Sequence, residues 1–265
     1  MVRFTSFLRC QILLAFVFPV LAQQVSPTEP NSSVRVPPPS ENATAPELEK
    51  QGDDLRAQKA YLDSVDYYRA AIKKGDSAPL HNKTGICFLQ LQRGGEARKE
   101  FKRAIQMDKA YAEPHNNLGA LDYNGGHYGQ AVSEYRKALQ LNDGNASFHS
   151  NLGTAYFAEK DWAHAIKEYS RARALDPTIF DRQSSGGVSI RLVSSTDLGH
   201  FHYMMAQIAG SQNDLDRCRS YLSKANEEGY PIRDALRDDQ FAGLRKDPNF
   251  VAFVRSLKPP QTADQ

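Results

Sequence analysis

The sequence predicts an all-α protein built from stacked helix pairs, and three observations lead to this prediction. Glycines recur at Gly52, Gly85, Gly119 and Gly153, which are spaced by 33, 34 and 34 residues. Small residues and aromatic residues recur in step with these glycines. A fixed period of this size is typical of repeats that stack, because a single unit cannot bury its own apolar face.

Each repeat is expected to contain two helices. Twelve residues after each glycine stands a second small residue, namely Ser64, Ala97, Ala131 and Ala165. Seven residues further on a third small residue follows, namely Ala71, Ala104, Ala138 and Ala172. Between these two ranks lies an aromatic residue, namely Tyr68, Phe101, Tyr135 and Tyr169. The small residues allow two helix backbones to approach closely, and the aromatic ring fills the space that remains.

These ranks resemble the pattern of the tetratricopeptide repeat (TPR) family. The best match is "NLGTAYFAEKDWAHAIKEYSRARALDP" at residues 151–177. The resemblance covers residues 45–177 as four units (45–77, 78–111, 112–145 and 146–177) and implies a right-handed α-solenoid. In one departure, Asp122 occupies a position that is usually aromatic, which Tyr123 could fill from the next position. In another, the proline that closes a unit occurs only as Pro177.

A divergent fifth unit is expected at 199–228, because Ala206, Cys218 and Ala225 resume the three small positions. It follows an inserted loop at 178–198, which reads either as a tolerated surface loop or as a flap over the binding groove.

Residues 229–258 are expected to form capping helices, and 259–265 a tail. Asp247 and Pro248 are typical of a helix cap and a first helical residue. An apolar stripe follows with Phe250, Phe253, Val254 and Leu257. The stretch resembles the segments that close many bacterial TPR arrays.

The N-terminal region is expected to direct export. Residues 11–22, "QILLAFVFPVLA", form an apolar run typical of a signal peptide at 1–22, cleaved before Gln23. A membrane anchor is the rival interpretation, but the run is shorter than the roughly 20 residues of a spanning helix. Residues 23–44, rich in Pro, Ser and Asn, are expected to be a disordered tether. The expected location is periplasmic or extracellular, and the resemblance favours a bacterial source.

Charge and cysteine content exclude several classes of partner. Of 33 basic residues, Arg3 and Arg9 lie in the signal segment, which leaves 31 basic and 31 acidic residues. A neutral chain of this kind does not attract nucleic acid or anionic lipid over long range. Cys87 and Cys218 fall in units that do not touch, so we expect two buried free thiols.

Histidines recur at one position of the repeat, and this pattern could indicate a metal site, an acid/base device or a structural role. They are His81, His115, His149 and His202, and Leu48 takes the place in the first unit. Neighbouring units are offset by ~10 Å, whereas zinc ligands lie within ~2.1 Å of the metal. We therefore expect no metal site and a structural role, with the imidazoles bonded to backbone or water. Catalytic motifs are absent from the sequence, so no cofactor and no enzymatic activity are expected.

The TPR resemblance implies that the first helix of each unit lines a concave groove. The residues it places there are Asn82, Lys83, Ile86, Gln90, Asn116, Asn117, Tyr123, Asn124, Ser150, Asn151, Thr154 and Phe157. The set is amide-rich, which suits the backbone of an extended peptide, and its two aromatics are expected to be exposed. Asn117 and Asn151 occupy equivalent positions and look like the asparagine ladder of some TPR solenoids. Ordinary solvation of a helix face remains the alternative for each asparagine.

The predicted function is that of a non-catalytic scaffold that binds a protein or extended peptide segment in the concave groove. Nucleic acid and a stable membrane span after signal cleavage are not expected. Two alternatives remain open. One is an enzyme or glycan-processing factor that uses the 178–198 insertion. The other is an architectural subunit of a cell-envelope complex.

Overall fold

The computed structural model describes residues 36–180 and 195–257, apart from residue 233. Over these ranges the protein is all-helical and contains no strand, as predicted. The first four helix pairs are α1 (Ala45–Ala57) and α2 (Tyr61–Lys74), α3 (Ala78–Gln90) and α4 (Gly94–Met107), α5 (Ala112–Asn124) and α6 (Tyr128–Leu141), and α7 (Ala146–Ala158) and α8 (Trp162–Leu175). The fifth pair is α9 (Ser195–Ser211) and α10 (Leu215–Glu227), and two short 3-10 helices, η1 (Asp239–Phe241) and η2 (Leu244–Lys246), precede α11 (Pro248–Ser256).

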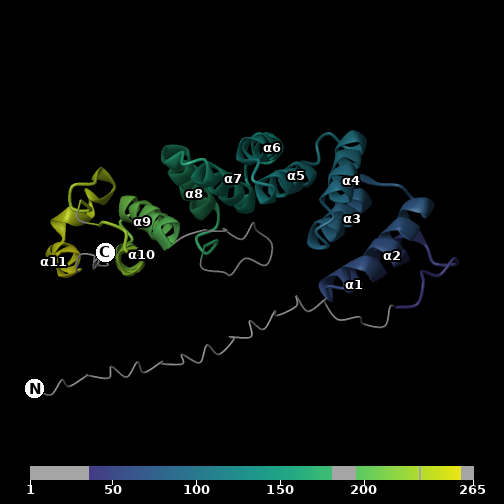
Figure 1. Ribbon diagram of the computed structural model, residues 1–265, viewed down its shortest axis with the longest axis horizontal. Helices are drawn as coiled ribbons and strands as arrows, with labels where there is room; N and C mark the ends of the chain where they lie inside the picture. Colours follow the sequence, from purple (N-terminus) through teal and green to yellow (C-terminus); the bar gives the residue numbers. More distant parts are fainter. Residues whose placement is uncertain (1–35, 181–194, 233, 258–265) are drawn as a thin grey trace, which may run out of the picture. The chain divides into compact units, whose positions relative to one another are not determined.

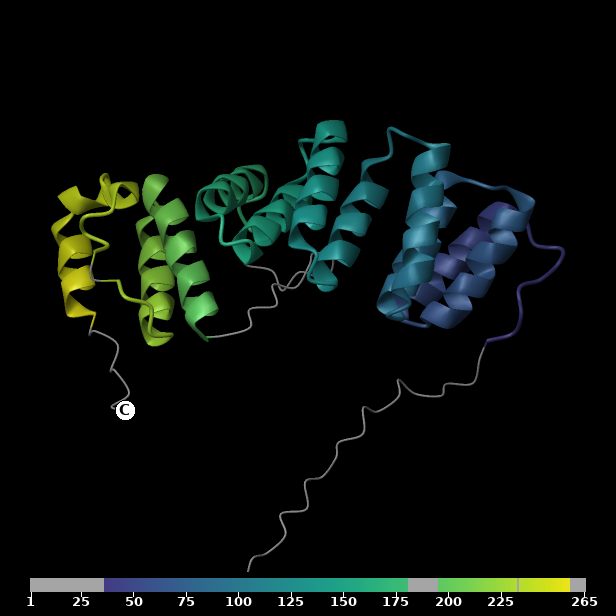
Figure 2. The same ribbon diagram turned by 45° about the horizontal axis from the view of Figure 1, so that its top comes forward.

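Consecutive helices pack as hairpins, and each hairpin packs on the next (Figures 1 and 2). The second helix of one pair contacts the first helix of the following pair, as α2 does with α3 and α6 with α7. The first helices also contact one another, α3 with α5 and α5 with α7. Side chains of α3, α5 and α7 are thereby brought onto one continuous face.

The repeating glycine lies directly under the repeating aromatic ring. A Cβ atom added at Gly52, Gly85, Gly119 or Gly153 would lie 2.5 to 2.7 Å from the ring of Tyr68, Phe101, Tyr135 or Tyr169, respectively. All four rings are fully buried. No side chain fits between such a ring and the helix backbone, so the close approach requires glycine. The predicted helix pairing is confirmed at this contact.

The unusual Asp122 is buried beside Tyr123. Tyr123 packs into the core between the third and fourth pairs, and thus fills the aromatic position as predicted. Asp122 is 2 % exposed and accepts a hydrogen bond from the Arg98 guanidinium of α4 at 2.5 Å. A charge-assisted bond therefore joins the second unit to the third.

A second, partly buried ion pair joins the fourth unit to the fifth. Arg173 of α8 is 7 % exposed, and its guanidinium donates to the Asp214 carboxylate at 2.5 Å. Asp214 is also the N-cap of α10, where it accepts from the Arg217 backbone N–H. One carboxylate thus fixes both the start of α10 and its contact with α8.

The fifth unit and the cap share one core. Ala206, Cys218 and Ala225 are fully buried, and Leu222 lies where the other units have an aromatic. Asp247 caps α11 and accepts from the Asn249 backbone N–H at 2.8 Å, as predicted. The predicted apolar stripe packs into this core, although α11 ends at Ser256, before Leu257.

Two predicted irregular segments differ from the structure at one end. The predicted tether is 23–44, but within 36–44 the Lys74 ammonium donates to the Glu41 carbonyl at 2.6 Å, and Thr44 forms a capping box with Glu47. The predicted loop 178–198 ends earlier, because α9 begins at Ser195. The alternatives for this loop fall on 181–194, and the predicted signal segment on 1–22, both outside the described residues.

Cys87 and Cys218 are buried free thiols, as predicted. In the part of the chain that the structure describes, no helix combines the length and the apolar character needed to cross a membrane.

Candidate binding surface

The residues predicted to line a groove lie on α3, α5 and α7, and we call their shared surface the first-helix face. The structure divides them into two groups. Exposed or half-buried are Lys83, Ile86, Gln90, Asn116, Asn117, Asn124 and Ser150. Buried are Asn82, Tyr123, Asn151, Thr154 and Phe157.

The expectation that Tyr123 and Phe157 are exposed is wrong. Their exposed fractions are 7 % and 6 %. The Tyr123 ring packs against Tyr128, and the Phe157 ring lies edge-on to Trp162 with centroids 5.1 Å apart. Each ring ends a first helix, where the following helices cover it, because burial of an aromatic ring is favourable wherever a neighbour supplies apolar surface.

The asparagines form a chain of hydrogen bonds across three units. The Asn151 amide donates to Asn116 at 2.8 Å, and the Asn117 amide donates to Asn82 at 2.9 Å. Asn116 donates to Asn117 at 3.4 Å and thereby joins these two bonds. Asn82 in turn donates to the Tyr111 hydroxyl at 3.1 Å, at the N-cap of α5. The predicted ladder therefore serves first as a link between units.

This chain changes what a substitution of Asn117 should do. We expect Asn117→Ala to lower the free energy of unfolding by about 1 to 2 kcal/mol, because the buried Asn82 carbonyl loses its donor. Urea unfolding followed by circular dichroism measures the change. Asn124→Ala, an exposed asparagine on the same helix, is the control and should shift stability by only a few tenths of a kcal/mol. Equal effects of the two substitutions would contradict a structural amide chain.

At the N-terminal end of the first-helix face, Lys83 is held by two carboxylates of α1. Its ammonium donates to Glu49 at 2.7 Å and to Asp53 at 2.6 Å. Burial alone would lower the pKa of Lys83, but the bonds to these carboxylates raise it. Lys83 thus forms a third ion pair between units, and it is already paired.

Three of the repeated histidines bond to glutamates on the second helix of their own unit. The Nδ1 atoms of His81, His115 and His149 lie 2.5 to 2.7 Å from the carboxylates of Glu100, Glu134 and Glu168, respectively. We expected backbone or water partners, and only the His149 Nε2 contact to the Asp143 carbonyl is of that kind. Glutamate is favoured here because it stands on the facing helix, nineteen residues after each histidine.

In the third unit the glutamate has two partners. The Glu134 carboxylate accepts from the Lys137 ammonium at 2.8 Å and contacts His115 at 2.7 Å. Burial would raise the pKa of Glu134, whereas the bonds to Lys137 and His115 lower it. This position between a histidine and a lysine therefore favours an ionised carboxylate.

An aromatic cluster at the junction of the fourth and fifth units was not predicted. The His200 ring lies 4.1 Å from Trp162 and 5.0 Å from Tyr230, measured between ring centroids. The cluster draws on α8, α9 and the segment that follows α10, so no single repeat pattern reveals it. Burial lowers the pKa of His200.

The lowered pKa of His200 predicts a loss of stability in acid. Between the folded-state pKa and the ordinary value of 6.5, the unfolded chain binds more protons, so stability falls as pH decreases through this window. We expect His200→Gln to reduce this part of the pH dependence. Urea unfolding between pH 7 and the acid limit of reversibility measures it. His127→Gln, at an exposed histidine, is the control and should leave the profile unchanged.

Among residues 36–180 and 195–257, no group of three or more His, Cys, Asp or Glu side chains could hold a metal ion. The repeated histidines belong to different units. Each one contacts a glutamate of its own unit.

Sequence models of the tetratricopeptide repeat match residues 49–112 and 146–179, and a TPR repeat model matches 121–160. No curated protein sequence matches the chain. The structure of pilF from Pseudomonas aeruginosa is similar, with a TM-score of 0.52 and 18% identity over 79% of this chain and 88% of that one.

Two further solved structures resemble the chain at 14% identity. MamA from Desulfovibrio magneticus RS-1 has a TM-score of 0.49, over 69% of this chain and 94% of its own. YrrB, described as a TPR protein with an unusual peptide-binding site, has a TM-score of 0.46 over 76% of this chain and 91% of its own. The repeat matches, taken with the buried glycine and aromatic contacts of the four helix pairs, show that the chain contains tetratricopeptide repeats between residues 49 and 179.

Proposed function

We propose that the protein is a non-catalytic scaffold that binds an extended segment of a partner protein along the first-helix face. The observation that carries the proposal is the half-buried pair Asn116 and Asn117 in the middle of this face. Each carboxamide offers two N–H groups and two lone pairs. The amide chain uses one N–H and one lone pair of each, so one of each remains for a ligand.

These two amides are held in place before any ligand arrives. Asn117 is fixed by Asn82 on α3, and Asn116 is fixed by Asn151 on α7. Ordering a side chain on binding costs about 0.5 to 1.5 kcal/mol, and a side chain that is already ordered avoids this cost. A peptide backbone presents alternating C=O and N–H groups, which match a carboxamide that can still donate and accept.

The test uses substitutions at exposed or half-buried positions outside the amide chain. Gln90 and Ser150 lie on the first-helix face, whereas Gln106 and Ser133 are exposed on the second helices α4 and α6. The double variant Gln90→Arg/Ser150→Arg places two long side chains over the proposed ligand path. Gln106→Arg/Ser133→Arg makes the same chemical changes elsewhere and is the matched control.

A partner recovered from envelope extract on the immobilised chain is purified and titrated by calorimetry into the chain and both variants. We expect the first-helix variant to bind at least about tenfold more weakly, which corresponds to ~1.4 kcal/mol, and the control to bind as the unmodified chain does. Thermal melts should agree among the three proteins. Equal affinities would place binding on another surface.

We also propose that the chain is exported, so that the partner is a periplasmic or extracellular protein. The apolar run at 11–22 and the small residue Ala22 support this proposal. N-terminal sequencing of the protein purified from its source should begin at or near Gln23. Recovery of Met1 on a membrane-bound form would contradict it.

A further inference from the structure

The fifth unit breaks the histidine–glutamate pairing of the units before it. By the repeat spacing, the residue that corresponds to Glu100, Glu134 and Glu168 is Tyr221. His202 keeps its place but bonds instead to the Glu228 carboxylate at 2.6 Å, at the end of α10. Its ring stacks on Tyr221 with centroids 6.1 Å apart.

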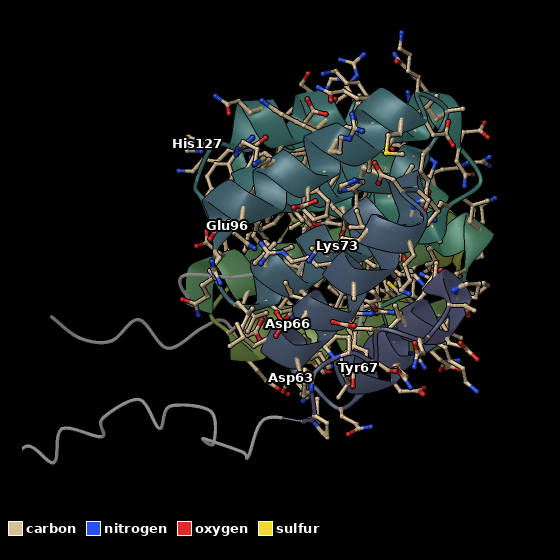
Figure 3. The ribbon with its side chains drawn as sticks, turned by 90° about the vertical axis from the view of Figure 1, so that its right-hand side faces the viewer. Asp63, Asp66, Tyr67, Lys73, Glu96 and His127 are labelled. Carbon is tan, nitrogen blue, oxygen red and sulfur yellow. The ribbon has the colours of Figure 1, made fainter. Side chains whose placement is uncertain are left out.

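The first unit shows what happens when both members of the pair are replaced. There Leu48 stands in place of the histidine and Tyr67 in place of the glutamate. Leu48 is fully buried, and Tyr67 packs against the same core from α2, next to Asp66 and Asp63 (Figure 3). Neither position of the first unit therefore carries an imidazole or a carboxylate. The fifth unit replaces only the glutamate, by Tyr221, and keeps the histidine as His202.

The fifth unit also keeps the lysine that pairs with the glutamate in the third unit. In the third unit Lys137 bonds to Glu134, and the residue at the same position of the fifth unit is Lys224. Lys224 is exposed and lies over the Tyr221 ring, with its Nζ 5.6 Å from the ring centroid. Within the described ranges no carboxylate forms an ion pair with Lys224. Glu228 pairs with His202, and Asp214 pairs with Arg173 and Arg217.

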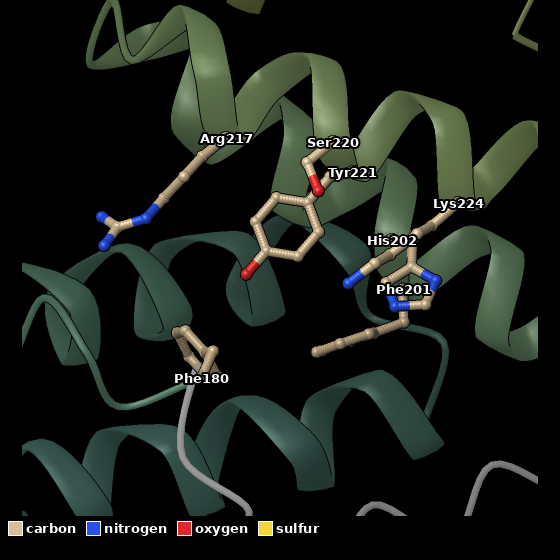
Figure 4. A pocket seen from close by; sticks show the side chains of 7 residues that line it. All are labelled: Phe180, Phe201, His202, Arg217, Ser220, Tyr221 and Lys224. Atoms are coloured by element: carbon tan, nitrogen blue, oxygen red, sulfur yellow. The ribbon is translucent and has the colours of Figure 1, made fainter.

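A pocket of about 300 Å³ lies where the glutamate is missing (Figure 4). It is lined by Phe180, Phe201, His202, Arg217, Ser220, Tyr221 and Lys224. Four of these residues follow one stripe of α10 at spacings of three and four, and Phe180 and Phe201 form the opposite wall. The lining thus combines aromatic walls with cationic groups.

We propose that this pocket binds an acidic side chain from an apolar segment of a partner protein, whose carboxylate takes the place of the missing glutamate beside Lys224. The charge of the lining selects a carboxylate, and the rings of Phe180, Phe201 and Tyr221 cover its hydrocarbon stem and apolar neighbours. The volume is at the lower limit for ligand pockets and suits one side chain. Because Lys224 and Ser220 are exposed, the occupant reaches them from solvent, as a side chain on another surface does.

This site is separate from the proposed function, because its stripe belongs to α10, a second helix, and not to the first-helix face. A negative result with Gln90→Arg/Ser150→Arg would not contradict the α10 pocket. A negative result at the pocket would not contradict binding on the first-helix face.

The probe is an acetylated and amidated pentapeptide with a central glutamate between leucines, paired with a twin that has glutamine. Both are titrated into the full chain and followed by amide NMR shifts in α10. We expect the glutamate peptide to bind about two- to fivefold more tightly than its twin, as a single exposed ion pair provides. Lys224→Gln should remove this difference. Lys137→Gln, at the same repeat position of a unit with its own glutamate, should retain it.

Tyr221→Glu supplies the carboxylate from within the chain. This variant should bind the glutamate peptide no more tightly than the glutamine peptide. Equal binding of the two peptides, or no saturation up to about 10 mM, would overturn the proposal. So would loss of the preference in Lys137→Gln. Free glutarate that binds as tightly as the peptide would assign the pocket to small carboxylates and not to a partner protein.

Discussion

Replacing Arg98 with valine is expected to lower the free energy of unfolding by about 3 kcal/mol, because it leaves the buried Asp122 carboxylate without its cation. The Asp122 side chain is 3 % exposed, whereas that of Arg98 is 37 % exposed. The cost therefore comes from the acid and not from the loss of arginine contacts. We place it at the lower end of the range for buried pairs because water reaches the guanidinium.

The repeat itself supplies the control for this prediction. Between the third and fourth units the positions of Arg98 and Asp122 are held by Val132 and Tyr156, which pack in one apolar cluster. The double variant Arg98→Val/Asp122→Tyr copies that apolar pair into the earlier junction. It should recover the stability lost in Arg98→Val, because replacing a buried ion pair by packed apolar residues is often neutral or stabilising.

Urea unfolding of the chain, Arg98→Val, Asp122→Tyr and the double variant completes a cycle that isolates the pair. If the double variant is no more stable than Arg98→Val, the apolar pair cannot substitute for the ion pair at this junction. An Arg98→Val variant as stable as the original chain would contradict the assigned burial of Asp122.

The sequence was sufficient to predict the fold because one contact recurs in each of the first four units. Gly119 against Tyr135 and Gly153 against Tyr169 are the same contact, so a register drawn from spacing alone places both correctly. The place of Tyr123, one position beyond Asp122, also followed from the register. Contacts that depend only on backbone register can be predicted in this way.

The candidate site was predicted less well, because its state depends on contacts between units. Asn117 and Asn82 occupy positions that a single unit leaves open, yet they bond to each other once α3 and α5 are neighbours. Phe157 is at a groove position by family pattern, but Trp162 and His200 cover it. Side-chain pairing across the interface is not visible in a one-dimensional repeat.

One missed feature was visible in the sequence. Glutamate follows the histidine by nineteen residues in three consecutive units, from His81 to Glu100 and onward. This spacing predicts a bond between the two helices of a unit, and its interruption at Tyr221 indicates the unusual fifth unit. Comparison of units with one another thus carries information that comparison with a family pattern does not.

Gly153→Leu is expected to lower the free energy of unfolding by about 3 kcal/mol, at the upper end of the cost of overpacking a core. A Cβ atom at Gly153 would lie 2.7 Å from the Tyr169 ring, which is fully buried and whose hydroxyl donates to Thr154. The ring cannot move without breaking that bond and opening the contact between α7 and α8. Leucine adds three more carbons to the same space, so the loss exceeds the gain of up to about 1 kcal/mol from better helix propensity.

Gly95→Leu makes the same chemical change where no heavy atom lies within 4 Å of an added Cβ. Gly95 is an exposed residue in the first turn of α4, so only the propensity gain of up to about 1 kcal/mol remains there. The two variants should therefore shift the urea midpoint in opposite directions, Gly153→Leu downward and Gly95→Leu slightly upward. The comparison separates steric exclusion at the glycine–aromatic contact from the general effect of removing a helical glycine. A downward shift of equal size in both variants would mean that glycine itself, and not the ring above it, is what α7 requires.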